Sequence, residues 1–227
     1  MKNLKDIIVE RLHINKDIDR YNYHPKTNDE LKELVDKLIE ERGIKANLND
    51  IDTSEITDMN NMFAESNFIG DISNWNVSNV KDMMHMFYNS KFDGDISNWD
   101  VSNVETMYGM FGCSKFNGDI SKWDVSNVKD MHMMFYNSKF TGENGDISEW
   151  DVSNVKNMDS MFYYSQFTCE NGDISKWDVS NVQYMEYMFA YSEFNGDISE
   201  WNVSNVEYMD HMFDKSPLEK NPPKWYK

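Results

Sequence analysis

Cysteine, proline and basic side chains are scarce in this 227-residue chain. The two cysteines, Cys113 and Cys169, occupy different places in the sequence pattern, so we expect no disulfide between them. Free thiols fit a reducing compartment. Three of the four prolines, Pro217, Pro222 and Pro223, lie at the C-terminal end, which leaves the rest of the chain nearly free of proline.

Long hydrophobic runs are also missing. The opening MKNLKDIIVERLHINKD has a charge every few residues, and no apolar stretch has the length of a signal peptide. No segment approaches the roughly 18 apolar residues of a membrane span. We therefore expect neither Sec export nor membrane insertion, and a cytoplasmic or virion-associated location is favoured over secretion.

Basic residues are few where acidic ones are many. The chain has 22 Lys and Arg against 40 Asp and Glu, a net charge of −18. Residues 1–43 hold 9 basic and 10 acidic side chains, so nearly all of the excess lies in residues 44–227. Direct binding to nucleic acid or to an anionic membrane is disfavoured, whereas basic, cationic or neutral partners fit.

What the chain has in abundance is internal repetition. One unit reads FDGDISNWDVSNVETMYGMFGCSK, and residues 47–66 form a first copy with Ile51 in the tryptophan position. Met-Phe pairs recur in the same rhythm as the tryptophans. The sequence therefore predicts seven tandem repeats of roughly 24 residues. The evenly placed tryptophans are Trp75, Trp99, Trp123, Trp150, Trp177, Trp201 and Trp225.

Each repeat divides into two halves with different periods. In GDIS, one isoleucine between Asp and Ser is typical of a short strand with one buried face. After the WDVSN turn, Val80, Met83, Met86 and Phe87 share one face of a short helix, with Ser78 or Asn79 as its N-cap. The predicted fold is an α/β repeat solenoid with one short strand and one short helix per repeat. Helices are wider than strands, so we expect the stack to curve around its strand face.

Both ends of the array have their own signals. In residues 1–43, Leu4, Ile7, Ile8 and Leu12 predict one amphipathic helix, and a second begins at a Thr27–Glu30 capping box and ends at Gly43. These helices either cap the first repeat or form an independent docking element. The predicted organisation is a helical N-terminal cap (1–43), a seven-repeat array (44–216) and a proline-rich C-terminal cap (217–227).

The repeats GDISNWDVSNVETMYGMF and GDISKWDVSNVKDMHMMF resemble those of BspA-like leucine-rich-repeat surface proteins, short forms of which occur in phages of gut bacteria. The resemblance covers residues 47–227. It implies a leucine-rich-repeat fold and a role in adhesion or protein binding, without enzymatic activity. Typical members carry a secretion signal, which this sequence does not show.

No catalytic or metal-binding arrangement emerges from the sequence. The five histidines share no metal-ligand spacing, and the Gly-Asp pairs lack the glycine density and lysine of a phosphate-binding loop. We therefore predict a non-enzymatic protein with no cofactor and no metal site. The tryptophan column is interpreted as core or turn-edge packing, with an exposed platform for stacking on sugars as the alternative.

The first candidate binding surface is a column of aspartates, one per repeat, which we call the aspartate row. Stacked strands would place these carboxylates about 4.8 Å apart, where each pair repels by roughly 0.9 kcal/mol even in water. Either each accepts a backbone N–H from the next coil, or together they form an acidic groove for a basic segment or a divalent cation. The row comprises Asp71, Asp95, Asp119, Asp146, Asp173 and Asp197.

The second candidate is an aromatic cluster in the C-terminal repeats, which we call the tyrosine patch. Tyr184, Tyr187 and Tyr191 would share one helical face, and equivalent positions in other repeats hold Asp or Thr. Such a group either packs between neighbouring helices or forms a binding hot spot. The patch comprises Tyr163, Tyr164, Tyr184, Tyr187, Tyr191, Tyr208 and His211.

Three-residue insertions, TGEN at 141–144 and TCEN at 168–171, should stack as a small rim on the working face. The function predicted from the sequence is an adhesion or interaction module that binds a protein or glycan through the strand face and the tyrosine patch. The alternative is an acidic nucleic-acid mimic that inhibits a DNA-binding host protein.

Overall fold

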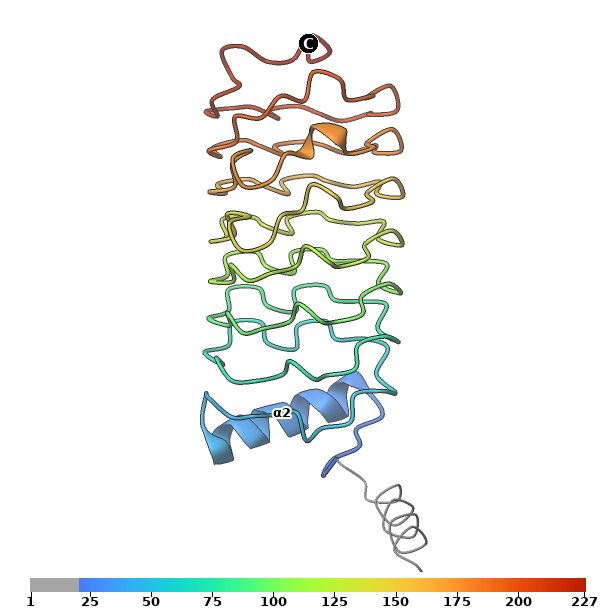
Figure 1. Cartoon of the computed structure of the whole chain (residues 1–227), viewed down its shortest axis with the longest axis vertical. Helices are drawn as coiled ribbons and strands as arrows, with labels where there is room; N and C mark the ends of the chain where they lie inside the picture. Colours follow the sequence, from blue (N-terminus) through green and yellow to red (C-terminus); the bar gives the residue numbers. More distant parts are fainter. Residues whose placement is uncertain (1–20) are drawn as a thin grey trace, which may run out of the picture.

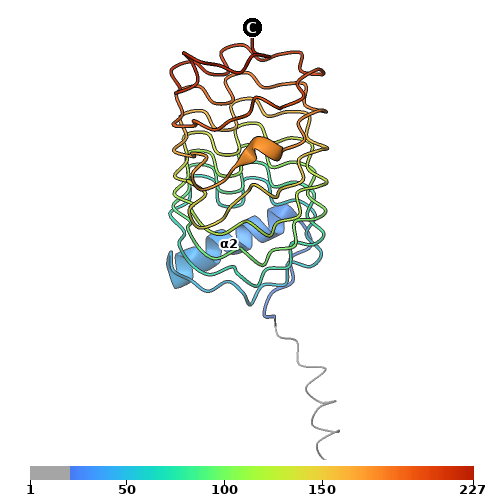
Figure 2. The ribbon, with the colours of Figure 1, turned by 45° about the horizontal axis from the view of Figure 1, so that its top comes forward.

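The structure, a computed structural model, describes residues 21–227. The chain winds into coils that lie one above another in a straight column, with the C-terminus at the far end from α2 (Figure 1). Seen from a tilted direction, the coils keep the same outline from one end of the stack to the other (Figure 2). The predicted helix with Leu4, Ile7, Ile8 and Leu12 lies outside the described residues.

The second predicted helix is confirmed as α2, Asn28–Arg42. Thr27 caps its N-terminus, where the Thr27 Oγ1 accepts the Glu30 N–H at 3.2 Å. Glu30 Oε2 accepts the backbone N–H of Lys26 at 2.7 Å, a variant of the capping box. Gly43 ends the helix, and Leu31, Val35 and Leu38 face the core. No helix within residues 21–227 is both long and apolar enough to cross a membrane.

The predicted α/β repeat solenoid, with a strand and a helix in every repeat, is wrong. Within residues 21–227 the helices are α2 and one short 3₁₀ turn, η1 (Ile174–Lys176). No strand or sheet forms there, and the β-type pairing between neighbouring coils is limited to isolated parallel bridges. One file of these bridges runs through Asp58, Asp82, Thr106, Asp130, Asn157, Tyr184 and Tyr208.

The GDIS segment is a turn because its aspartate binds its own backbone. The Asp95 carboxylate accepts the Ser97 N–H at 3.0 Å and the Ser97 hydroxyl at 2.7 Å. The Trp99 N–H then donates to the Ile96 carbonyl at 3.2 Å, which closes a second turn. Side-chain oxygens that satisfy the backbone locally compete with strand ladders, and here they prevail.

The Val-Met-Met-Phe segment is a run of linked turns, not a helix. The Met86 N–H donates to Met83 O at 3.2 Å, and the Ser90 N–H donates to Phe87 O at 3.2 Å. His85 (φ 53°) and Asn89 (φ 51°) are left-handed, which no α-helix tolerates in its interior. These turns, each closed by a bond from the N–H of residue i+3 to the carbonyl of residue i, recur about every three residues and return side chains to the same side. The apolar spacing therefore imitates a short helix.

The intervening backbone N–H groups reach the next coil. The His85 N–H donates to Tyr108 O at 2.8 Å, and the Phe87 N–H donates to Met110 O at 2.9 Å. The pattern continues across the first insertion, where the Met133 N–H donates to Asp159 O at 3.0 Å. Without helices to widen one side, the expected curvature does not arise and the column is straight (Figure 1).

Aromatic rings fill the interior of the column. Phe63, Phe87 and Phe111 stack in nearly parallel planes, with centroids 5.6 and 5.7 Å apart, and the series continues to Phe213. A second buried column, not identified from the sequence, contains Phe68, Phe92, Phe116, Phe140, Phe167 and Phe194.

The tryptophan column is core, as its primary interpretation predicted. The rings from Trp75 to Trp201 are at most 5% exposed. Each indole N–H donates to a carbonyl of the preceding coil, as Trp123 Nε1 does to Ile96 O at 3.1 Å. Buried rings held in this way offer no platform for sugars.

Each end of the described column is closed by a different device. α2 lies across the first coil, where Arg42 binds the Asp50 carboxylate at 3.0 Å and Tyr23 forms a parallel bridge with Ile51 (Figure 1). At the other end, Trp225 stacks on Trp201 with 6.5 Å between centroids, and its Nε1 donates to Ile198 O at 3.0 Å.

The left-handed turn positions can be tested at Ser160, whose φ is 55°. We expect Ser160→Gly to be more stable than Ser160→Ala by about 1 kcal/mol, because glycine adopts positive φ without the Cβ clash. Urea denaturation of both variants measures the difference. In a helix the order would be reversed, so a more stable alanine variant would contradict the turn geometry.

The indole bond can be tested with Trp123→Phe. We expect a loss of about 2–4 kcal/mol in unfolding free energy, because the Ile96 carbonyl loses its donor and a cavity opens. Trp225→Phe is the matched control, since it removes the same bond at a partly exposed ring and should cost less. Equal losses in both variants would show that burial of the carbonyl does not set the cost.

Candidate functional site

Each member of the aspartate row is a turn-forming residue. Asp71, Asp119 and Asp197, for example, accept the N–H of the serine two residues later at 2.9–3.0 Å. The predicted backbone donor from the next coil is wrong, because the turn places the donor in the same coil. Asp146 and Asp173 make the same bond at 2.8 and 2.9 Å.

These bonds offset the repulsion along the row. The Ser97 backbone N–H, followed by the Ser97 hydroxyl, holds the pKa of Asp95 below its usual value, against small opposing effects of Asp119 and Asp71. The Ser175 N–H does the same for the pKa of Asp173, with a further contribution from Lys176. The turn bonds likewise hold the pKa values of Asp71, Asp119 and Asp197 below the usual value. These three carboxylates, with those of Asp95 and Asp173, are therefore ionised near neutral pH.

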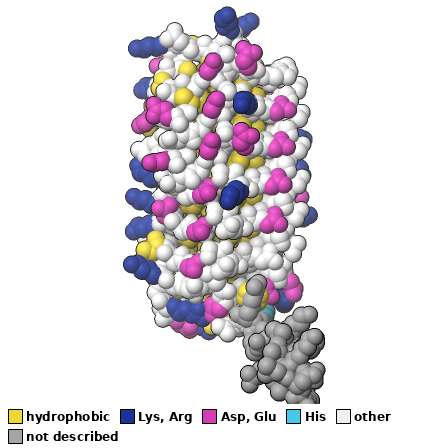
Figure 3. All heavy atoms as spheres, viewed as in Figure 1, with side chains coloured by type: hydrophobic (Ala, Val, Ile, Leu, Met, Phe, Trp, Pro, Cys, Tyr) yellow, Lys and Arg dark blue, Asp and Glu magenta, His cyan; other side chains and the backbone are white. Residues whose placement is uncertain are grey.

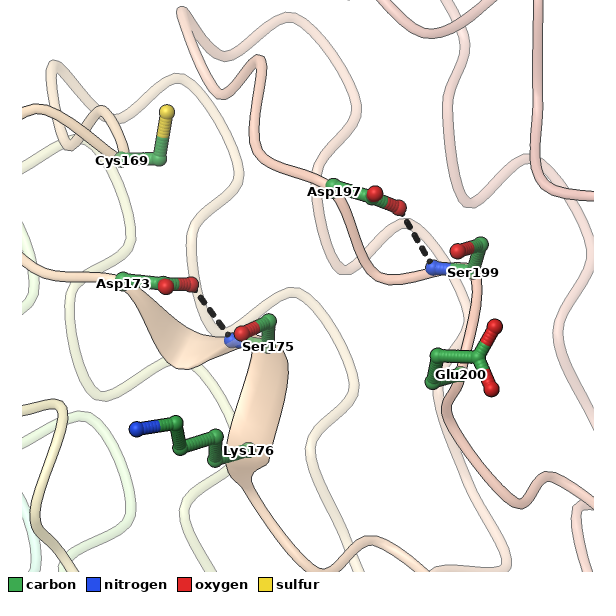
Figure 4. Close-up of a pocket in the computed structure, with 7 residues that line it drawn as sticks. All are labelled: Cys169, Asp173, Ser175, Lys176, Asp197, Ser199 and Glu200. Atoms are coloured by element: carbon green, nitrogen blue, oxygen red, sulfur yellow. Dashed lines mark hydrogen bonds between the residues drawn. The ribbon is translucent and has the colours of Figure 1, made fainter.

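Carboxylates line one face of the column in files parallel to its axis, with few basic side chains among them (Figure 3). Near the C-terminal end, Asp173 and Asp197 lie on adjacent coils beside Lys176 of η1 and Glu200 (Figure 4). The hollow between them has a volume of about 540 Å³. Across residues 21–227 no three His, Cys, Asp or Glu side chains are grouped to hold a metal ion.

An asparagine ladder runs beside the aspartate row and was not recognised in the sequence. The Asn127 side-chain amide donates to Ser102 O of the preceding coil at 2.7 Å, and Asn103 donates to Ser78 O at 2.8 Å. The SN pair of every WDVSN turn was visible, but the coil-to-coil register needed to assign it was not. This ladder is structural, because both of its ends are backbone or amide groups.

Tyr163 is the centre of the tyrosine patch. Its ring centroid lies 4.9 Å from that of Tyr164, 5.5 Å from that of Tyr191 and 6.1 Å from that of Tyr187. Tyr164 and Tyr191 stack at 4.6 Å. Burial, followed by the neighbouring phenols, raises the pKa of Tyr163. Five rings, those above together with His211, therefore form one continuous surface.

The patch is organised by the coil register and not by a helical face. Tyr187 stacks on His211 of the next coil, with centroids 5.0 Å apart. Tyr184 and Tyr208 form a second stack, with centroids 5.4 Å apart and planes within 3°. The predicted single helical face of Tyr184, Tyr187 and Tyr191 is wrong, because they occupy different turns, and the left-handed Tyr187 and Tyr191 point outward from their own coil.

The patch is exposed although its rings touch one another. Tyr164 and Tyr208 are 49% and 48% exposed, and Tyr184 and Tyr187 are 36% and 37% exposed. Lys215 holds its ammonium 5.2 Å from the ring centre of Tyr191. The rings therefore pack laterally on one another, although between turns and not between helices, and they still face solvent. The binding hot spot stays a prediction.

Ring contacts continue from the tyrosine patch towards the N-terminus, which was not predicted from the sequence. Tyr136 stacks on Tyr163 at 5.3 Å. Further along, Tyr108 lies between His85 and His132, with centroid distances of 4.6 and 4.8 Å. The spacing of these residues is visible in the sequence, but their contacts depend on the register between coils.

The two insertions lie side by side, as their positions predicted. Asn144 donates to Asn117 O at 2.7 Å, and a Cβ on Gly142 would lie 2.9 Å from Asn171 O of the second insertion. Cys169, in that insertion, lines the hollow between Asp173 and Asp197 (Figure 4). Its Sγ lies 3.2 Å from Asn195 Oδ1. The insertions thus border the aspartate row, and no ring contact joins them to the tyrosine patch.

Asp159 provides a test of the electrostatics beneath the patch. Burial raises the pKa of Asp159, although its carboxylate accepts the Glu186 N–H at 2.7 Å. A raised folded pKa destabilises the protein as pH rises above the unfolded value. We therefore expect Asp159→Asn to raise the melting temperature at neutral pH and to have little effect in acid, where the carboxyl is protonated.

Asp173→Asn is the control of opposite sign. The pKa of Asp173 is lowered, so its stabilising contribution is present above the unfolded pKa and is lost as pH falls through the folded value. Melting curves at neutral and acid pH should therefore show a loss of stability for Asp173→Asn at neutral pH only. Parallel pH profiles for the two variants would contradict the assignment.

Comparison with known proteins identifies one family. No curated protein and no solved structure matches the chain. The family model described as "Mycoplasma protein of unknown function, DUF285" matches residues 29–144 and 138–226, which together span nearly all of the described repeats. The chain belongs to the DUF285 family.

Proposed function

We propose that this chain is a non-enzymatic binding module that holds a basic segment of a protein partner against the tyrosine patch. The observation that carries the proposal is the exposure of mutually stacked tyrosines, which the fold does not require. The position of Tyr184 and Tyr208 is filled by Asp82, Thr106 or Asp130 in other coils, and the bridges there form equally well.

Charge supports a basic partner. The net charge of the chain is −18, and Glu186, Asp210 and Asp214 lie on the same turns as the patch. Lys215 over Tyr191 is an intramolecular example of an ammonium group on a patch ring. A lysine or arginine of a partner would find the same combination of π-face and carboxylate.

Rigidity supports a hot spot. Tyr187 and Tyr191 sit on backbone whose N–H groups donate to Asp210 O and Asp214 O of the next coil at 3.1 and 2.7 Å. Tyrosines already ordered by stacking lose little conformational entropy when a partner binds. Few interface residues carry most of the binding energy, and tyrosine is enriched among them.

The aspartate row would assist binding through its electrostatic potential more than through direct contact with the partner. Its inner oxygens are engaged in turns, while the outer oxygens add negative potential along the column, which speeds the encounter with a basic partner. The resemblance of the repeats to BspA-like adhesion proteins also favours a binding role, and the glycan partner considered from the sequence is less favoured because the tryptophans are buried.

A nucleic-acid mimic is the second candidate. The files of carboxylates along a straight column favour it, because they resemble a line of phosphates (Figure 3). Such a decoy would bind a DNA-binding enzyme mainly by charge. Its binding would be abolished by moderate salt and by competing duplex DNA, and it would not need the tyrosines.

The test uses an array of lysine- and arginine-containing peptides, with citrulline or acetyl-lysine versions as neutral partners. We expect the triple variant Tyr184→Ala, Tyr187→Ala, Tyr208→Ala to bind the selected basic peptides about 10- to 30-fold more weakly, as loss of a hot spot implies. Its melting temperature should change little, because these rings are exposed.

The matched control replaces the same three residues with phenylalanine, which keeps the rings and removes the hydroxyls. Retained affinity in that variant would assign binding to the ring faces. Binding that is indifferent to the alanine changes and is abolished by duplex DNA would overturn the proposal in favour of the mimic. Binding to neutral peptides as strong as to basic ones would also overturn it.

A further inference from the structure

The turn from Met107 to Cys113 differs from all its counterparts in the described column. It carries glycine at two outward-facing positions, Gly109 and Gly112. A Cβ on Gly109 would lie 2.3 Å from His85 Cδ2, and one on Gly112 would lie 2.9 Å from Tyr88 Cδ2. The two rings of the preceding coil therefore lie close over glycine backbone, which other residues would prevent.

The two rings line an open hollow of about 600 Å³, which we call the His85 hollow. The His85 ring is tilted by 55° against Tyr88 and by 50° against Tyr108, with centroids 5.0 and 4.6 Å away. All three rings line the hollow. The hollow is lined by Asn61, Ala64, Glu65, His85, Tyr88, Tyr108 and Met133.

The charge of the hollow is negative. Glu65 is exposed at its rim, and no lysine or arginine among residues 21–227 pairs with it. None of the lining residues is Lys or Arg. Burial, followed by the repulsion of His132, lowers the pKa of His85, so its ring is neutral at neutral pH and offers a π-face.

From this geometry we propose that the His85 hollow binds an organic cation, a quaternary ammonium or a guanidinium group, on the faces of His85, Tyr88 and Tyr108, with Glu65 as counter-ion. Aromatic faces attract such cations through the ring quadrupole, and an unpaired carboxylate at the rim adds a counter-charge. The acidic chain raises their local concentration. The site is separate from the tyrosine patch and does not rest on the function proposed for it.

The test is an NMR titration that follows the ring signals of His85, Tyr88 and Tyr108 in the full chain. The probes are choline, its uncharged isostere 3,3-dimethylbutan-1-ol, Nα-acetyl-arginine amide, Nα-acetyl-citrulline amide and glucose. We expect each cation to bind at least about fivefold more tightly than its neutral counterpart, in line with a cation–π contribution. Choline binding indicates a free small cation, whereas binding of the arginine amide alone indicates a peptide side chain.

Two variants locate the site. Glu65→Gln should weaken cation binding and leave the neutral probes unchanged, and Tyr108→Ala should weaken it about fivefold or more. Tyr184→Ala, in the tyrosine patch, should not change the titration at His85. If the alcohol or glucose binds as well as choline and the arginine amide, or if no probe shifts these signals, the proposal is overturned.

Discussion

The whole structure depends on one constraint, the register of backbone hydrogen bonds between successive coils. In each Met-Phe segment, alternate N–H groups donate to carbonyls of the next coil, while the others close turns within their own coil. This alternation requires left-handed residues such as His85 and Tyr187, which cost free energy individually. The cost is offset because the backbone N–H groups of every coil bind carbonyls of the next coil, and because the phenylalanine and methionine side chains are buried between them.

The same register converts sequence periodicity into surface chemistry. Side chains that recur at one position of the repeat become neighbours along the column, as the Tyr184–Tyr208 and Tyr187–His211 stacks show. Outward positions carry no requirement from the core, so they are free to vary. The tyrosine patch, the aspartate row and the His85 hollow can therefore be built on one scaffold without changing its interior.

Features that rest on spacing or on local capping were predictable from the sequence. They are the repeat boundaries, the capping helix at Thr27–Gly43 and the buried Ile, Trp, Val, Met and Phe positions. The absence of a helix and a strand in each repeat was not predictable, because turns that recur every three residues place Val80, Met83 and Met86 inward just as a helical turn does. The members of both candidate surfaces were identified by their spacing, but the turn-capping role of the aspartates and the coil-to-coil stacking of the tyrosines were not.

By itself, the sequence determined that the chain is a stack of equivalent units, which residues fill its core and that its surface is strongly acidic. Those properties follow from composition and period. Only the tertiary structure decided how each unit is built and which outward side chains meet. The physical reason is that backbone N–H groups have two competing partners, within the coil and in the next one, and the choice depends on contacts a full coil away along the chain.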